Sequence, residues 1–263
     1  WIGISIPCEY YQSSIQHSSV QDESLQNCFL VSYSISQESN VSEDSISDGP
    51  FYAKVGKLYV SGNYTGGLKT GNWITYFNSG QIYIVENYSE GLKDGLYLKL
   101  SKRGYIEEQA EYSNDLLNGK RILFRVGGKL KLSEEYINGI LSGKKVVFYD
   151  RGLIQEESNY LHGEKNGNSK WYNTEGVLIA DYNYKNGQFD GLQYTFHSND
   201  SIRSENYYED GVSIGISKEF YSNGNLKLKG SFKNGERTGK WYYYDETGTL
   251  NETIKYKKGE VVK

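Results

Sequence analysis

The feature that most constrains this chain is a glycine that returns every 24 residues. With Gly239 taken as position 1 of a unit, position 1 of every preceding unit back to Gly71 is also glycine. A weaker unit, with Tyr52 and Tyr64 in register, comes before these eight. Residues 47–263 therefore contain nine tandem units without an insertion. A fixed period of this length is typical of a repeat architecture in which each unit contacts only its neighbours.

Three more positions of the unit hold the same type of residue from unit to unit, and we call each such set of residues a column. Position 6 is Tyr, Phe or Leu in each of the eight full units, and position 12 is Ile or Leu. Position 18 is aromatic in all of them: Tyr88, Tyr112, Tyr136, Tyr160, Tyr184, Tyr208, Phe232 and Tyr256. We expect these columns to be structural, with each ring stacked against the neighbouring units, because aromatic side chains suit a half-buried sheet face.

Each unit has the pattern of a β-hairpin. Aromatic residues are frequent between positions 2 and 8, and apolar and polar residues alternate between positions 11 and 19, which favours two strands. Positions 20–21 are Asn-Gly or Asp-Gly in four units, the dipeptides of type I′ turns. The prediction is all-β: an elongated, open, solenoid-like single-sheet meander of tandem 24-residue β-hairpin repeats, with no helix longer than two turns in residues 47–263.

Residues 1–46 match no part of the repeat, and we predict that they form a separate, acidic N-terminal cap segment. They contain the two cysteines of the chain, Cys8 and Cys28. A disulfide would pin this segment in an oxidising compartment, whereas free thiols would fit a cytosolic protein. We predict that the two cysteines are joined, and we therefore favour the periplasm or the cell surface over the cytoplasm.

Charge and motifs exclude several classes of function. Residues 1–53 hold seven acids and no Lys or Arg, and the remainder carries 29 basic and 26 acidic residues, which is too balanced for a nucleic-acid-binding surface. No apolar stretch is long enough to span a membrane as a helix. Adjacent carboxylates, such as Glu134 and Glu135, would point to opposite faces of a strand. The sequence therefore predicts no enzyme, no metal site and no cofactor.

The unit G-x-W-x-x-Y-x-x-x-G-x-L-x-x-x-x-x-Y-x-x-G is clearest in residues 71–91 and 239–259. It resembles the MORN repeat variant of the bacterial YwqK-type antitoxin-like proteins. The resemblance implies single-sheet hairpin arrays that serve as interaction surfaces, in some members as immunity partners of toxins. In the better-known MORN proteins, similar repeats serve membrane-associated scaffolds. This chain departs from the pattern at position 3, where tryptophan occurs only at Trp73 and Trp241.

Three functions stay open at this point. We favour a non-enzymatic protein-interaction scaffold or accessory subunit of a bacterial cell-envelope assembly, which would associate with a membrane only through a larger complex. The second is a cytoplasmic antitoxin or immunity-type protein that neutralises a toxin partner. The third is a lipid- or glycan-binding surface protein.

A protein partner must distinguish one unit from the next, so residues that break the repeat are the candidate partner-binding residues. Large aromatic residues do so at positions 3 and 5: Trp73, Tyr97, Trp171 and Trp241. Buried tryptophan and tyrosine dominate the binding energy of many interfaces. The alternative is that these rings only cover a sheet edge or a neighbouring strand.

Overall fold

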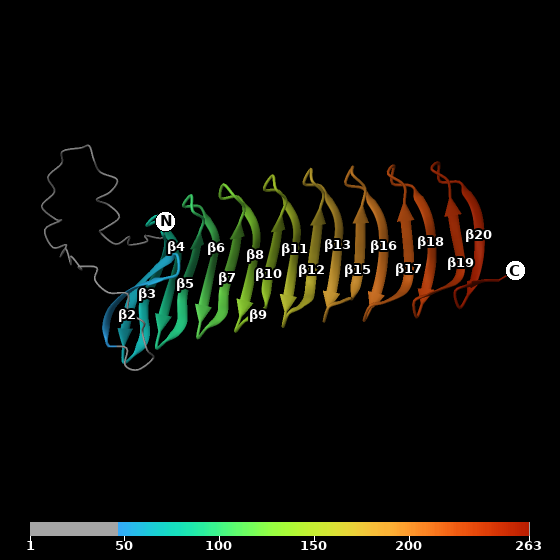
Figure 1. Cartoon of the computed structure of the whole chain (residues 1–263). Helices are drawn as coiled ribbons and strands as arrows, with labels where there is room; N and C mark the ends of the chain where they lie inside the picture. Colours follow the sequence, from blue (N-terminus) through green and yellow to red (C-terminus); the bar gives the residue numbers. More distant parts are fainter. Residues whose placement is uncertain (1–46, 263) are drawn as a thin grey trace, which may run out of the picture. The chain divides into compact units, whose positions relative to one another are not determined.

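The computed structural model describes residues 47–262, which form a single open antiparallel sheet without a helix (Figure 1). Apart from two split strands described below, neighbours in the chain are neighbours in the sheet, so the strands follow one another from β2 in blue to β20 in red. This confirms the predicted all-β meander of hairpins. The described residues contain no helix long and apolar enough to cross a membrane.

The sheet has 21 strands, because two strand positions are each split into a short and a longer piece. The pieces β9 and β10 both pair with β8, and the pieces β14 and β15 both pair with β13. In chain order the strands are β1 (Gly49–Val55), β2 (Leu58–Thr65), β3 (Leu68–Phe77), β4 (Ile82–Ser89), β5 (Leu92–Leu100), β6 (Ile106–Ser113), β7 (Leu116–Phe124), β8 (Leu130–Ile137), β9 (Ile140–Leu141), β10 (Gly143–Phe148), β11 (Ile154–Leu161), β12 (Glu164–Tyr172), β13 (Leu178–Lys185), β14 (Gln188–Phe189), β15 (Gly191–Phe196), β16 (Ile202–Glu209), β17 (Val212–Phe220), β18 (Leu226–Lys233), β19 (Glu236–Tyr244), β20 (Leu250–Lys257) and β21 (Glu260–Val261).

The pairing register of neighbouring strands determines which positions of the repeat lie opposite one another. Glu86, at position 16, pairs with Trp73 at position 3 of its own unit and with Tyr97 at position 3 of the next unit. Because side chains alternate across a strand, positions 3, 5, 14, 16, 18 and 23 of all units point to one face, which we call the aromatic face. Most of the buried side chains of residues 47–262 lie on it, and Ala110 is fully buried there. The core is therefore one-sided and lies along a single face of the sheet.

The two-residue turns at positions 20–21 have the predicted conformation. Both turn residues have positive φ in every full unit, for example 49° at Asn138 and 79° at Gly139. The N–H of position 21 donates to the carbonyl of position 23 in the preceding unit, as Gly139 does to Leu117 at 2.7 Å. This hydrogen bond therefore joins the turn at the end of each unit to the preceding unit.

The first strand of each unit begins earlier than predicted. Strand β5 starts at Leu92, which is position 22 of the preceding unit, and runs through Gly95 at position 1. Gly95 has a φ of 108°, and the register of β4 and β5 shifts opposite it. In six of the eight full units the repeated glycine thus lies inside a strand, and in the two split units Gly143 and Gly191 begin the longer piece. As a consequence, positions 22 and 23 belong to the sheet.

Candidate functional site

The two position-3 tryptophans lie inside the aromatic face. Trp73 is 3% exposed and Trp241 is 1% exposed. Each indole covers the position-16 glycine of the preceding unit, so closely that a Cβ atom on Gly62 or Gly230 would overlap the ring. This placement fits the alternative that the rings cover a neighbouring strand. That the two rings bind a partner stays a prediction.

All four candidate aromatic residues take part in one recurring contact, in which a cation at position 23 lies over two rings of the aromatic face. The distances from the cation to the ring centres are 4.2 to 5.5 Å. The ring pairs are Trp73 with Tyr88, Tyr97 with Tyr112, Trp171 with Tyr184 and Trp241 with Tyr256, under Lys69, Lys93, Lys165 and Arg237 respectively. Each such contact contributes about 0.5–1 kcal/mol at a partly exposed site.

The position-18 rings contact other columns rather than one another. Tyr88 packs edge-on against Trp73, and Tyr112 packs edge-on against Tyr97. Among residues 47–262, no aromatic contact joins two position-18 rings directly. Burial and, second, the neighbouring Glu86 carboxylate raise the pKa of Tyr88 to about 12. The column therefore links neighbouring strands through cations and rings at positions 23 and 3.

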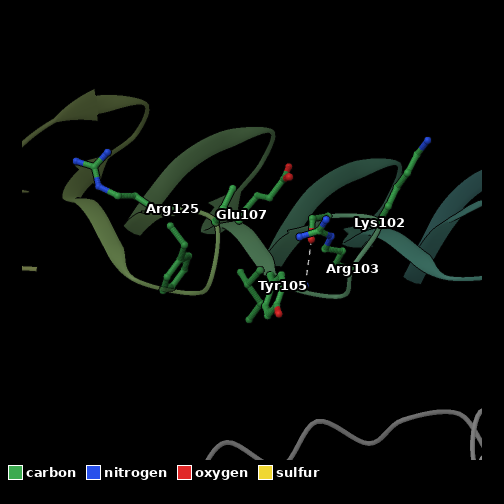
Figure 2. Close-up of a pocket in the computed structure, with 9 residues that line it drawn as sticks. Lys102, Arg103, Tyr105, Glu107 and Arg125 are labelled. Carbon is green, nitrogen blue, oxygen red and sulfur yellow. Dashed lines mark hydrogen bonds between the residues drawn. The ribbon is translucent and has the colours of Figure 1, made fainter. Parts of the chain in front are cut away.

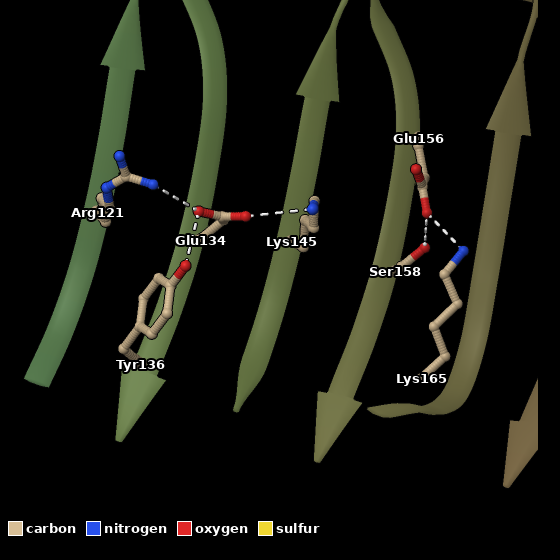
Figure 3. Close-up of polar contacts among 7 residues, drawn as sticks. All are labelled: Arg121, Glu134, Tyr136, Lys145, Glu156, Ser158 and Lys165. Atoms are coloured by element: carbon tan, nitrogen blue, oxygen red, sulfur yellow. Dashed lines mark hydrogen bonds and ion pairs between the residues drawn. The ribbon is translucent and has the colours of Figure 1, made fainter. Parts of the chain in front are cut away.

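The middle units replace tryptophan with charged residues. Arg121 and Lys145 occupy position 3, and both contact the carboxylate of Glu134, at 3.3 and 3.2 Å (Figure 3). The hydroxyl of Tyr136 donates to the same carboxylate at 3.0 Å. Burial alone would lower the pKa of Lys145, but the hydrogen bond and charge of Glu134 raise it overall. Because Glu134 has a side chain only 7% exposed, its three donors compensate for the loss of water.

The next unit has a similar pair. Glu156 accepts from the Ser158 hydroxyl at 2.6 Å and from the Lys165 ammonium at 2.7 Å (Figure 3). Ser158 is almost fully buried. Each carboxylate is held by donors of its own face, which is a structural arrangement. No group of three or more potential metal ligands occurs within residues 47–262. Cys8 and Cys28 lie outside the described residues.

On the opposite face, six aliphatic side chains at positions 19 and 22 line the two-residue turns of consecutive hairpins, each between 41% and 57% exposed. We call them the aliphatic row: Leu68, Leu92, Leu116, Ile137, Ile140 and Leu161. Members of neighbouring hairpins adjoin, because Leu68 lies against Gly91, the residue before Leu92. In later units these positions are mostly charged, as at Glu164 and Lys185. The row is therefore a feature of the N-terminal half of the sheet.

A pocket of about 480 Å³ lies at the longer turns, which join positions 7 and 12 (Figure 2). It is formed by two neighbouring hairpins, at the ends of β5–β6 and of β7–β8. The lining residues are Ser101, Lys102, Arg103, Tyr105, Ile106, Glu107, Phe124, Arg125 and Val126. Three of these are cations and one is an acid, so the pocket is basic.

Four segments of the chain match the MORN repeat variant. The matched residues are 69–90, 165–186, 214–234 and 237–258. MORN repeats are generally associated with protein or membrane-lipid interaction and are typically non-enzymatic. No curated protein matches the chain.

The matched MORN segments begin at Lys69, Lys165 and Arg237 in three of the four cases, so the match includes the cation that covers the rings. The aliphatic row and the basic pocket were missed by sequence reasoning. The signal for the row was present in the 24-residue alignment, as four aliphatic residues at position 22 of consecutive units. Strands predicted to end at position 19 leave position 22 in a turn, so the sequence alone does not predict the row.

Proposed function

We propose that this chain is a non-enzymatic scaffold that binds another protein through the aliphatic row. The observation that carries the proposal is the continuity of the row along consecutive turns, with every side chain 41–57% exposed. Contiguous exposed apolar surface is uncommon on soluble proteins and marks interaction sites. The association of MORN repeats with interaction supports this assignment.

The energy of such a contact is limited by the size of each side chain. Full burial of a leucine or isoleucine contributes about 1.5–3 kcal/mol, so covering a side chain that is already half-buried contributes roughly 1 kcal/mol. Association itself costs several kcal/mol. A partner must therefore cover most of the row at once, which requires an elongated apolar face that spans several hairpins.

The charges beside the row favour a protein over an anionic membrane. Glu90 and Asp94 lie two residues from Leu92 in the chain, and Asp115 precedes Leu116. The lysine next to Leu92 is Lys93, which points to the aromatic face and pairs with a carboxylate at 2.6 Å. An anionic lipid surface would meet these acids and be repelled.

More specifically, we propose that the scaffold belongs to a bacterial cell-envelope assembly. It would contact a membrane only through the larger complex. This proposal rests on the predicted disulfide between Cys8 and Cys28. An oxidised pair, shown by the mass of the alkylated native protein, supports an exported scaffold. Two free thiols move the assignment to the cytoplasm, where neutralisation of a toxin becomes the better hypothesis.

The test compares capture of the partner by two variants of the full chain. Leu92→Glu with Leu116→Glu places charges in the row, and Gln188→Glu places one at the same position 22 of a later unit. We expect the double variant to lose the proteins that the wild-type chain captures from its native cell, while the control retains them. Both must first show the circular dichroism and melting temperature of the wild type. Equal capture by all three proteins would refute the role of the row.

A further inference from the structure

We infer that the basic pocket between the turns of β5–β6 and β7–β8 binds a short acidic segment of a protein partner. Carboxylates of that segment would face Lys102 and Arg103, and one apolar side chain would lie against Phe124 and Val126. The inference rests on the proposed function in that the partner is a protein. It adds a second contact, at the opposite ends of the strands from the aliphatic row.

Two of the three cations at the pocket are not neutralised within residues 47–262. Arg125 forms an ion pair with Asp150 at 2.9 Å and donates to the Phe148 carbonyl at 2.8 Å. In contrast, Lys102 and Arg103 form no ion pair with any residue of the described sheet. The Lys102 ammonium lies 5.9 Å from the ring centre of Phe77, in the preceding hairpin. These two adjacent cations therefore keep their charge available for an anionic ligand.

The one acid of the pocket does not offset these charges. Glu107 is directed to Lys99, with 3.6 Å between the ammonium and the carboxylate. The pocket thus keeps two cations without an ion-pair partner, and a carboxylate accepts hydrogen bonds from both.

The apolar part of the pocket accommodates a side chain. Val126 is 87% exposed and Tyr105 is 45% exposed, while Phe124 and Ile106 are half-buried beneath them. A pocket of about 480 Å³ is in the size range of small-ligand sites, which hold a few residues of a peptide. An acidic segment with one aromatic or aliphatic residue would therefore satisfy both the cations and the apolar floor.

This pair of cations belongs to one turn. The equivalent positions 8 and 9 of the other full units are Asn78-Ser79, Val126-Gly127, Asp150-Arg151, Thr174-Glu175, Ser198-Asn199, Ser222-Asn223 and Glu246-Thr247. An extended anionic membrane that lay along these turns would also meet their acids. A short peptide would cover the single basic turn alone, which favours the peptide over the membrane.

The test uses two labelled hexapeptides, Asp-Asp-Phe-Asp-Asp-Leu and its amide counterpart Asn-Asn-Phe-Asn-Asn-Leu, with the full chain and fluorescence anisotropy at low salt. We expect saturable binding of the acidic peptide and at least about ten-fold weaker binding of the amide peptide, because charge-assisted hydrogen bonds are lost. Added salt should weaken binding of the acidic peptide only.

The deciding variant is Lys102→Ser with Arg103→Ser, and its control is Lys255→Ser with Lys257→Ser. Both remove two exposed cations, so the net charge changes equally. We expect the first to bind the acidic peptide at least about ten-fold more weakly and the second to bind it as the wild type does. Equal affinity of the two variants, or no binding by the wild type, overturns the proposal.

Vesicles of phosphatidylserine and phosphatidylcholine form the second arm. Vesicle binding that depends on Lys102 and Arg103, without peptide binding, would replace the peptide with a membrane. Partner capture by the wild-type chain that depends on the aliphatic row would leave the proposed function standing if the peptide result fails. If neither peptide binding nor partner capture that depends on the aliphatic row is observed, the proposal that the chain is a scaffold is wrong.

Discussion

Gly230→Ala is the substitution that tests the packing of the aromatic face most directly. Gly230 is at position 16, beneath the indole of Trp241, and its φ lies outside the left-handed region. Alanine is therefore compatible with the backbone at this residue. The added Cβ would, however, lie well under 3.0 Å from three atoms of the ring, closer than real Cβ atoms approach other side chains. The ring or the strand has to move.

The expected cost follows from how tightly the ring is held. Trp241 is 1% exposed, with Phe232 edge-on at 5.1 Å and the Arg237 guanidinium 4.2 Å from its ring centre. Overpacking of a well-packed site costs about 1–3 kcal/mol. Complete loss of a buried tryptophan costs about 3–5 kcal/mol, which sets the upper limit. We predict a loss of about 2–3 kcal/mol, confined to β18–β20 because units contact only their neighbours.

In a protein that already carries Trp241→Ser, we expect Gly230→Ala to stabilise the sheet instead of destabilising it. Serine occupies position 3 at Ser169 and Ser217 in other units, so it is compatible with the register. Without the indole above it, Gly230→Ala should stabilise the strand by about 0.5–1 kcal/mol, because glycine is unfavourable inside a strand. Amide hydrogen exchange of β19 and β20 measures both effects locally, with the amides of β4 as the internal control. An equal cost of Gly230→Ala in both backgrounds would refute the reasoning.

Two further predictions concern charge on the aromatic face. Above pH 10, stability should fall steadily toward pH 12, because tyrosines ionise in the unfolded chain while burial raises the pKa of Tyr88 and Tyr97 to about 12 in the fold. Circular dichroism with tyrosinate absorbance checks this, and constant stability across that window would contradict it. Glu134→Ala should cost about 2 kcal/mol in urea denaturation, because Lys145 loses its partner and Arg121 loses one of two. A loss under about 0.5 kcal/mol, the usual size for a surface change, would show that Glu134 is not needed there.

Much of the fold was predictable because the period is unbroken. Alternation and Asn-Gly turns predict hairpins, and a constant unit length predicts that they stack in chain order. The sequence leaves cover of a neighbouring strand by the tryptophans as one of two alternatives, although it contains a signal that favours this one. Trp73 and Trp241 each come 11 residues after a glycine, Gly62 and Gly230, at position 16 of the preceding unit. Recognising the pair needs the cross-strand register, which depends on the bulge at position 1.

The basic pocket depends on contacts that no sequence period contains. Two consecutive turns form it, and their lengths agree with the repeat, so the alignment places Lys102 and Val126 in the same column. In the structure they line one pocket from neighbouring hairpins. Whether a turn cation is neutralised depends on side-chain geometry across units, as for Arg125 with Asp150. The sequence alone does not contain this geometry.

The two faces of the sheet differ in what their irregularities mean. On the aromatic face, a change at position 3 is matched by a change at position 16 of the preceding unit: tryptophan lies over glycine, Arg121 pairs with Ala110, and Ser169 pairs with Ser158. Residues that break the repeat there are accounted for by their neighbours in the array. The aliphatic row breaks the repeat on the other face with 41–57% exposed side chains. Its departure from the later units therefore supports the proposal that a partner binds the row rather than the tryptophans.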